Sequence, residues 1–315
     1  MKLRIGSRGS QLALWQAHHI EGLLVAEGHQ VEIEIIKTTG DKLQEVTFAQ
    51  VGSKGMFTKE IEEALAEGRI DLAVHSLKDL PTELPEPFTL AATPHRVDPR
   101  DVLVAVNHKN LAEVPQGARV GTSSQRRRAQ LKALRPDLEA VEFRGNVDTR
   151  LRKLAEGQVS AILLAAAGLD RLGKTDWVRQ RLSPREFCPA AGQGSLGIEA
   201  RKNDAAVLEA LSFLDHAPTR FAVTAERAAL AALGGGCQVP IGVHCRAAIA
   251  PGAESGDWFE IFGVVAAPAS GKAVRVEHSI AAAGADPVKL GALIAQKLKD
   301  AGADEILTCA AEDQK

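Results

Sequence analysis

Strand and helix patterns alternate along the first 75 residues. A short apolar segment, 3–5, leads into residues 11–26, where Leu12, Trp15 and Leu23 recur at helical spacing. Residues 31–36 alternate apolar and charged side chains, as a half-exposed strand does. Thr58 is placed to cap a helix over 58–66 that Gly68 ends, and 70–74 is a short buried strand. This alternation predicts an α/β fold with a largely parallel sheet.

A similar plan recurs further along the chain. Val120-Gly121-Thr122 echoes Ile5-Gly6-Ser7, and residues 155–159 echo 66–70 at a different offset. Short matches can arise by chance, but two similar α/β lobes with a cleft between them are the simplest architecture. Residues 94–100, with two prolines, are expected to join the lobes.

The last third of the chain has another order of elements. A long helix over 219–233 is followed by alternating strands at 242–249, 259–266 and 273–280, then by a final helix over 286–301, and 251–256 resembles an exposed hairpin loop. Strands grouped before a helix predict a smaller α+β domain. The expected boundaries are 1–95 plus about 195–213 for the first lobe, 100–190 for the second and 217–315 for the C-terminal domain.

Composition is that of a soluble globular protein, with 45% hydrophobic and 25% charged residues. The longest apolar run, 161–169, is far shorter than the roughly 20 residues of a membrane helix, so it predicts a buried strand and the turn after it. Residues 1–6 lack the apolar block of a secretion signal. We therefore expect a cytoplasmic protein with no membrane partner.

The four cysteines form no C-x-x-C pair and no zinc-ligand spacing. Cys188, Cys245 and Cys309 are expected to be buried apolar residues. Cys237 differs because it follows three glycines, which let the backbone approach a ligand closely. A buried thiol and a reactive thiol are equally consistent with that setting.

Charge is unevenly distributed. The net charge is −2, which predicts neither a nucleic-acid nor a membrane partner, yet residues 126–153 hold nine basic and four acidic side chains. A concentrated basic segment in a nearly neutral protein indicates a defined anionic ligand.

The sequence 120–128 is the strongest candidate anion site. A strand ends in a small-residue turn, and a helix then begins among Thr122, Ser124, Arg126 and Arg127. Helix N-termini, hydroxyls and bidentate guanidinium groups all suit phosphate or carboxylate, which this pattern does not separate. The alternative is a solvated basic helix face. Residues 144–150 add Arg144 and Arg150, for which surface ion pairs with Glu142 and Asp148 are equally plausible.

A second candidate site follows the strand at 70–74. Lys78 and Asp79 lie where ligands bind in open α/β sheets, so they could form an amine nucleophile with its partner, a charge clamp beside an acid–base group, or an ordinary surface ion pair. His75 is given no role. Residues 192–197 match G-x-G-x-x-G, but no strand precedes them and no clear helix follows, which disfavours a dinucleotide site.

Seven ordered segments together resemble the porphobilinogen deaminase family over nearly the whole chain. They include Ser7-Arg8-Gly9-Ser10, His75-Ser76-Leu77-Lys78-Asp79 and Gly235-Gly236-Cys237-Gln238-Val239-Pro240; the full set is 7–17, 51–57, 75–81, 120–127, 144–150, 166–173 and 235–242. The resemblance implies two lobes like type II periplasmic binding proteins and a third domain that carries a cofactor cysteine.

The activity implied by the resemblance is that of a transferase of tetrapyrrole and haem biosynthesis. It joins four porphobilinogen molecules head to tail, releases ammonia at each addition and frees hydroxymethylbilane with water. Its primer is a dipyrromethane cofactor held by a thioether, here to Cys237. Each pyrrole carries an acetate and a propionate, and these carboxylates would account for the many arginines.

Site residues follow from the resemblance position by position. Asp79 is the catalytic residue: it would stabilise positive charge on pyrrole nitrogens and could help to move protons. The cofactor set is Ser76, Lys78, Asp79, Thr122, Ser124, Arg126, Arg127 and Arg150, and the substrate set is Arg8, Ser10, Lys54, Arg144, Arg150, Arg171 and Gln193. No metal is expected, and the family expectation is a monomer. Gln50 departs from the family, which often has Lys there.

The sequence is compatible with three other functions. A binding protein for a small dicarboxylate explains the lobes but not the glycine-flanked cysteine. A Schiff-base lyase would use Lys78. Nucleic-acid binding through 126–153 is disfavoured because aromatic residues are only 4% of the chain and Tyr is absent. Few aromatic rings are therefore available for nucleic-acid bases to stack on.

Overall fold

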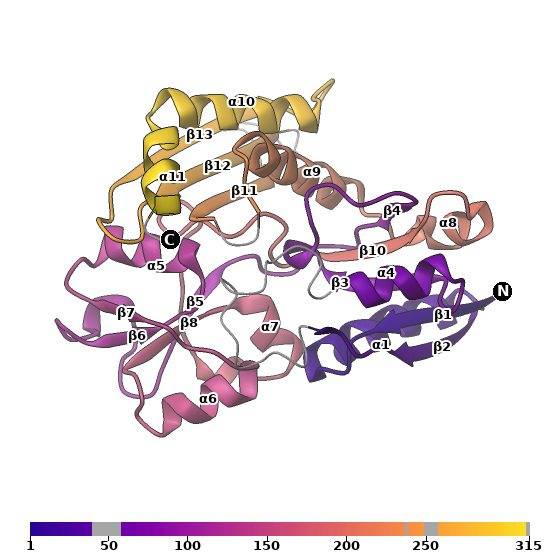
Figure 1. Cartoon of the computed structure of the whole chain (residues 1–315), viewed down its shortest axis with the longest axis horizontal. Coiled ribbons are helices and arrows are strands. Elements are labelled where there is room, and N and C mark those ends of the chain that lie inside the picture. The colour runs from indigo at the N-terminus through magenta and orange to yellow at the C-terminus, as the bar shows by residue number, and fades with distance from the viewer. Residues whose placement is uncertain (40–57, 237–238, 249–257, 313–315) are drawn as a thin grey trace. The chain divides into compact units, whose positions relative to one another are not determined.

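The computed structural model describes residues 1–39, 58–236, 239–248 and 258–312 (Figure 1). The chain divides into two compact units. Unit 1 comprises Met1–Val97 and Gly194–Arg220, and unit 2 comprises Asp98–Gln193 and Phe221–Lys315. The chain first passes between them at 97–98, inside the predicted crossing at 94–100. Three sheets are formed by the described residues.

Unit 1 is built on a five-stranded sheet in the order β2-β1-β3-β10-β4. β1 is parallel to β2 and β3, whereas β10 is antiparallel to β3 and β4. The strands are β1 (Lys2–Ser7), β2 (Gln30–Ile35), β3 (Leu72–Ser76), β4 (Phe88–Ala92) and β10 (Leu196–Arg201), and the helices are α1 (Gln11–Ala26), α4 (Lys59–Ala66) and α8 (Ala205–Leu211), with single 3-10 turns η1 (Leu77–Asp79) and η4 (Ser212–Leu214).

Alternation along β3 separates the two faces of this sheet. Leu72 and Val74 belong to the apolar cluster that includes α1 and α8, while Ala73 belongs to the cluster that includes α4. Helices therefore cover both faces, which is the two-sided burial that α/β sheets require.

Unit 2 contains a second sheet with the same plan, in the order β7-β6-β8-β5-β9. β6 is parallel to β7 and β8, and β5 is antiparallel to β8 and β9. The elements are β5 (Asp101–Ala105), η2 (Leu111–Glu113), β6 (Arg119–Gly121), α5 (Gln125–Leu134), β7 (Glu139–Val141), α6 (Val147–Ala155), β8 (Ala161–Ala165), α7 (Ala166–Arg171), η3 (Thr175–Trp177) and β9 (Val178–Arg181). The repeated lobe predicted from the echoes is confirmed.

The glycines of the echo occupy matching strands, β1 and β6, for the same reason. A Cβ on Gly6 would come within 2.2 Å of Ile70 Cδ1, and one on Gly121 within 2.6 Å of the Phe143 ring. Each strand needs a glycine because a large side chain crosses it closely.

The C-terminal part of unit 2 is an antiparallel sheet, β11-β12-β13, with helices packed on it. The elements are α9 (Ala217–Ala232), β11 (Ile241–Ala248), β12 (Trp258–Ala266), β13 (Ala273–Ala281), α10 (Pro287–Asp300) and α11 (Ala303–Glu312). One face of the sheet packs on α10 through Ile294 and Leu298. The other packs on α5, where Phe262 and Val264 contact Ala129 and Cys188.

The structure corrects several predictions about single helices, caps and strands. The helix at 286–301 is not the last, because α11 follows it. Thr58 stands at the start of α4 but makes no side-chain capping hydrogen bond. The strand predicted at 70–74 begins at Leu72 and extends to Ser76, so His75 lies within it. The hairpin at 251–256 lies outside the described residues.

The three-domain boundaries stay a prediction, and the packing of α5 on β12 groups the second lobe with the C-terminal sheet. Among the described residues, no helix has the length and apolar character needed to cross a membrane.

Candidate active site

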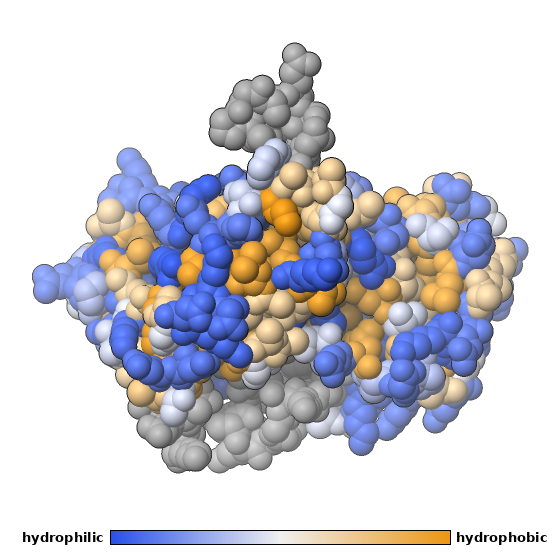
Figure 2. Space-filling view, turned by 90° about the horizontal axis from the view of Figure 1, so that it is seen from above, coloured by the Kyte–Doolittle hydropathy of each residue, from blue (hydrophilic) through white to orange (hydrophobic). Residues whose placement is uncertain are grey.

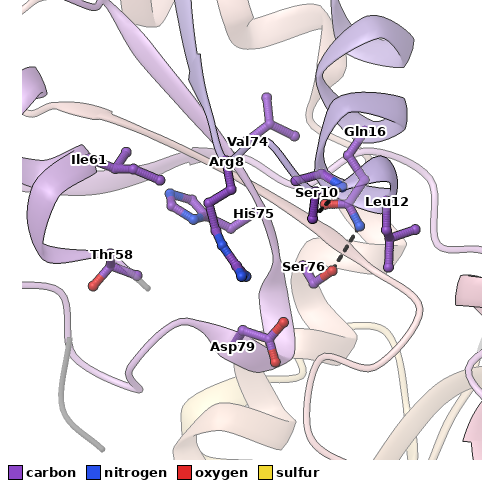
Figure 3. A pocket seen from close by; sticks show the side chains of 11 residues that line it. Arg8, Ser10, Leu12, Gln16, Thr58, Ile61, Val74, His75, Ser76 and Asp79 are labelled. Atoms are coloured by element: carbon purple, nitrogen blue, oxygen red, sulfur yellow. Dashed lines mark hydrogen bonds between the residues drawn. The ribbon is translucent and has the colours of Figure 1, made fainter. Parts of the chain in front are cut away.

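A pocket opens in unit 1 at the carboxyl ends of β1 and β3, the edge where open α/β sheets bind ligands (Figure 3). Its empty volume of about 490 Å³ includes space that is open to solvent. Residues from the end of β1, the first turns of α1, the start of α4, β3 and η1 line it: Arg8, Ser10, Leu12, Ala13, Gln16, Thr58, Ile61, Val74, His75, Ser76 and Asp79.

The N-terminus of α1 gives one side of the pocket an anion-binding character. Ser10 caps the helix, and its hydroxyl accepts a hydrogen bond from the Ala13 N–H at 3.3 Å. The unpaired N–H groups and the dipole of this 16-residue helix favour a negative charge, as does the half-buried Arg8 beside them. Gln16 donates to the Ser76 hydroxyl at 2.8 Å and so ties α1 to β3 (Figure 3).

Asp79 brings the opposite charge to the same pocket. It ends η1, whose Leu77 is buried and donates its N–H to the Ser195 carbonyl at 3.0 Å. This anchor holds the turn while the Asp79 side chain stays exposed, and Figure 3 shows its carboxylate and the Arg8 guanidinium directed into the same space. Lys78, beside it, is half-buried.

The predicted anion site of unit 2 is built around a buried carboxylate that sequence reasoning did not identify. Asp101, at the start of β5, accepts from Arg126 Nη1 at 2.6 Å, from Arg127 Nε at 2.9 Å and from Gln193 Nε2 at 3.0 Å. Burial opposes ionisation, but the two guanidinium groups outweigh it and hold the pKa of the Asp101 carboxyl well below its usual range.

Arg126 and Arg127 are only 4% and 6% exposed, so the alternative of a solvated helix face is wrong for both. Arg126 also donates to the Cys188 carbonyl and Arg127 to the Leu163 carbonyl. The hydroxyls before them shape the turn: Thr122 accepts from the Ser124 N–H at 3.2 Å, and Ser124 caps α5.

Further arginines give this lobe a positive excess. Arg150 is largely buried; burial, together with the nearby charge of Arg127, lowers its pKa to about 10, and its Nε has no hydrogen-bond partner among the described residues. Burial likewise lowers the pKa of Arg171 to about 10. Arg144 forms the ion pair with Glu142 that was considered from the sequence, at 2.7 Å, whereas Asp148 pairs with Lys174. A carboxylate-bearing ligand fits such a lobe.

The cysteines divide into two groups. Cys188 and Cys245 are buried as expected, and burial raises the pKa of the Cys188 thiol to about 12. Cys309 is exposed, so its predicted burial is wrong. Cys237, Lys54 and Gln50 lie outside the described residues.

Local structure decides one further sequence feature, the glycine motif at 192–197. The G-x-G-x-x-G match runs into β10, so a strand and not a helix follows it, and the phosphate-binding geometry of a dinucleotide site is not formed. In the part of the chain that the structure describes, no group of three or more His, Cys, Asp or Glu residues is arranged to hold a metal ion.

Comparison with known proteins agrees with the seven segments. Residues 3–209 match the family model "Porphobilinogen deaminase, dipyromethane cofactor binding domain", and residues 220–300 match "Porphobilinogen deaminase, C-terminal domain". Porphobilinogen deaminase of Trichlorobacter lovleyi is 52% identical over 97% of this chain and 96% of its own length. The protein of that name from Geobacter sulfurreducens is 49% identical over 97% and 94%.

Solved structures of binding proteins match part of the chain. The methionine binding protein MetQ covers 68% of this chain and 89% of its own, with 13% identity and a TM-score of 0.43. The L-cystine solute receptor of Neisseria gonorrhoeae covers 68% and 85%, with 16% identity and a TM-score of 0.39. The two family models together span most of the sequence, and the chain belongs to the porphobilinogen deaminase family.

Proposed function

We propose that Asp79 is the catalytic residue and Cys237 the cofactor attachment point of this transferase, which joins four porphobilinogen molecules head to tail, releases ammonia from each and gives hydroxymethylbilane. The dipyrromethane cofactor supplies the free ring carbon from which the chain grows. The observation that carries the assignment of Asp79 is its exposed carboxylate at the sheet edge, in a pocket that also holds Arg8.

Asp79 acts by stabilising charge. Loss of ammonia from porphobilinogen leaves a methylene-pyrrolenine, in which positive charge develops at the pyrrole nitrogen. A fixed carboxylate facing that N–H lowers the energy of the cation, and it does so most strongly where water is excluded. Because η1 is anchored through Leu77, the carboxylate needs little reorganisation when the charge appears.

Incoming substrate is held by its acetate and propionate groups. Arg8 and Ser10 at the N-terminus of α1 supply one set of donors in the pocket. Arg144, Arg150 and Arg171 bind substrate or the growing chain, and burial of Arg150 and Arg171 strengthens each contact with a carboxylate. We assign Lys54 and Gln193 to the same set; Gln193 acts through its bond to Asp101.

Cofactor carboxylates are bound by the basic lobe of unit 2. The single buried carboxylate of Asp101 lies near three guanidinium groups, those of Arg126, Arg127 and Arg150. A bound anionic group would offset the remaining positive charge. Thr122 and Ser124 add hydroxyls. In unit 1 we assign Ser76 and Lys78 to the cofactor as donors, and Asp79 to the pyrrole N–H groups of the cofactor. Because Arg126 and Arg127 are buried, they are poorly placed to contact a nucleic-acid backbone. We propose a cytoplasmic monomer with no nucleic-acid or membrane partner.

Mass spectrometry of the intact protein, with peptide mapping, tests the proposal. The expected result is an increment of two pyrrole units on the peptide that contains Cys237, and none in the Cys237→Ser variant. A Cys309→Ser variant is the matched control, because it removes an exposed thiol and should keep the increment. An unmodified Cys237 in active enzyme would refute the attachment point.

A further inference from the structure

The wall of the pocket contains a buried histidine and a buried carboxylate side by side. His75 of β3 is 8% exposed and Glu199 of β10 is fully buried. In the antiparallel register Gly197 lies opposite His75 and Glu199 opposite Ala73, so the two side chains are diagonal neighbours on one face of the sheet. His75 Nε2 lies 3.0 Å from Glu199 Oε2.

This contact determines which ring nitrogen carries the proton of the neutral ring. A carboxylate accepts hydrogen bonds, so the pair is satisfied when Nε2 carries the proton and donates it. The lone pair of the neutral ring is then on Nδ1. Among the described residues Nδ1 has no hydrogen-bond partner, and His75 is part of the pocket wall (Figure 3). The same arrangement of carboxylate, imidazole and open nitrogen makes a histidine a general base.

Charged groups on several elements surround this imidazole. Glu199 lies behind the ring, and its Oε1 has no hydrogen-bond partner among the described residues. Glu62 of α4 is close enough for burial and the charge of Glu199 to raise its pKa. Arg8 at the end of β1 and Asp79 of η1 are the other charged groups that line the pocket.

We propose that His75, held in its Nε2–H tautomer by Glu199, is the proton acceptor of the condensation; this rests on the proposed function of the pocket. In each addition the C–N bond of protonated porphobilinogen breaks, and ammonia departs with the electron pair. A free ring carbon of the growing chain then forms the new C–C bond to the methylene carbon that ammonia has left. The ring carbon then loses its proton to His75 Nδ1, and the C–H pair restores the aromatic ring. The imidazolium passes the proton to ammonia, which leaves as ammonium, so His75 is regenerated.

This assignment separates two tasks within one pocket. Asp79 must stay ionised to stabilise each new cation, and a carboxylate that took the ring proton would lose that charge. An imidazole, with an ordinary pKa near 6.5, is better matched to accepting a proton near neutral pH. His75 is the catalytic base, and Glu199 is a positioning residue that acts through it.

The test compares His75→Gln with the wild type, using porphobilinogen deuterated at the free ring carbon. We expect kcat to fall about 100-fold or more with KM changed only a few-fold, the size usual for loss of a general base. The deuterium isotope effect on kcat should rise, because proton removal becomes rate-limiting, and the acid limb of the kcat–pH profile should disappear. His18→Gln is the matched control: it removes a histidine paired with Glu21 at 2.8 Å on the exposed surface of α1, and its kinetics should be unchanged.

Glu199→Gln provides a second variant that retains side-chain volume. The amide oxygen still accepts from Nε2–H but carries no charge, so kcat should fall about 10-fold and the acid limb should move to lower pH. Unchanged turnover in folded, cofactor-loaded His75→Gln would overturn the inference, and so would reduced turnover with an unchanged isotope effect and pH profile. A wild-type protein that forms no hydroxymethylbilane would instead refute the proposed function.

Discussion

At the scale of single residues, two aspartates of this protein do different work because they differ in exposure. Asp79 is exposed in the pocket of unit 1, where its charge is available to a ligand. Asp101 is fully buried in unit 2, where two guanidinium groups and an amide use its oxygens. We therefore expect Asp101 to position the groups that contact it and Asp79 to act on substrate.

Replacement of Asp79 by Asn tests the open carboxylate. The amide keeps the size of the side chain but removes the negative charge that stabilises the pyrrole cation. We expect the cofactor to remain attached while turnover falls about 100-fold or more, the usual loss for an electrostatic contact to a transition state. Steady-state kinetics and intact mass check this together, and normal turnover would exclude the role.

Replacement of Asp101 by Asn tests the neutralised carboxylate. Removing it leaves two buried arginines without their counterion, so the free energy of unfolding should fall by about 3–5 kcal/mol near pH 7. The exposed Asp176→Asn is the control and should change it little.

The same variant has a defined pH dependence. The pKa of Asp101 is lower in the folded protein than in the unfolded chain. Its contribution to the free energy of unfolding is therefore complete above the unfolded value of about 3.9 and is lost as pH falls through the folded value. The difference in the free energy of unfolding between wild type and Asp101→Asn can be measured with urea at pH 7, 5 and 3.5. This difference should become smaller only at pH 3.5. A gap that narrows already between pH 7 and 5 would contradict the pairing.

At the scale of elements, one side chain of α9 connects three segments of unit 2. Glu226 is fully buried and accepts from the N–H groups of Gly192 and of Cys245 in β11, each at 2.7 Å. His244 Nδ1 lies 3.3 Å from the same carboxylate. A helix, a strand and the glycine loop before β10 therefore share one acceptor.

Glu226→Ala should destabilise the protein by about 2–5 kcal/mol, because two buried N–H groups lose their acceptor. Glu226→Gln, which retains one side-chain oxygen, should lose less. Chemical unfolding gives the comparison, with Glu305→Ala on the exposed side of α11 as a control. Equal stability of the two Glu226 variants would show that the acceptor count does not determine the loss.

At the scale of the whole molecule, the surface favours a single chain in solution. The large exposed apolar side chains of the described residues, such as Val25, Phe213 and Val288, belong to different helices and turns. On the face seen in Figure 2, apolar residues gather in the middle and hydrophilic residues surround them. Large apolar side chains exposed singly on different elements are normal for monomers.

We therefore expect sedimentation velocity to show one species with the mass of one chain at micromolar concentration. With a net charge of −2 and its main basic cluster partly buried, the protein should also show no salt-dependent affinity for DNA. A concentration-dependent shift to twice the mass, or DNA binding that weakens steeply with salt, would contradict this view of the surface.

The sequence by itself determined the order and type of most elements. Helical spacing in 11–26 and alternation in 273–280 are local properties, and α1 and β13 appear within a residue of those bounds. The ordered segments also indicated the family. The resemblance assigned Arg8 and Ser10 to the substrate and Ser76 and Asp79 to the cofactor, and all four line one pocket. Helix α11 was missed, although Gly302, with φ of 95°, marks the break between it and α10.

Only the tertiary structure decided which charged groups meet. From the sequence, Arg126 and Arg127 were candidates for an anion site, with a solvated helix face as the alternative, and only the fold shows that they contact Asp101 of β5. His75 was given no role, and only the fold shows that Glu199 of β10 lies beside it. These partners lie 25 and 124 residues apart. A short stretch of sequence carries hydrophobic periodicity and helix or strand propensity. Which buried charges pair depends instead on the order and register of the strands. Register is set by packing of the whole sheet.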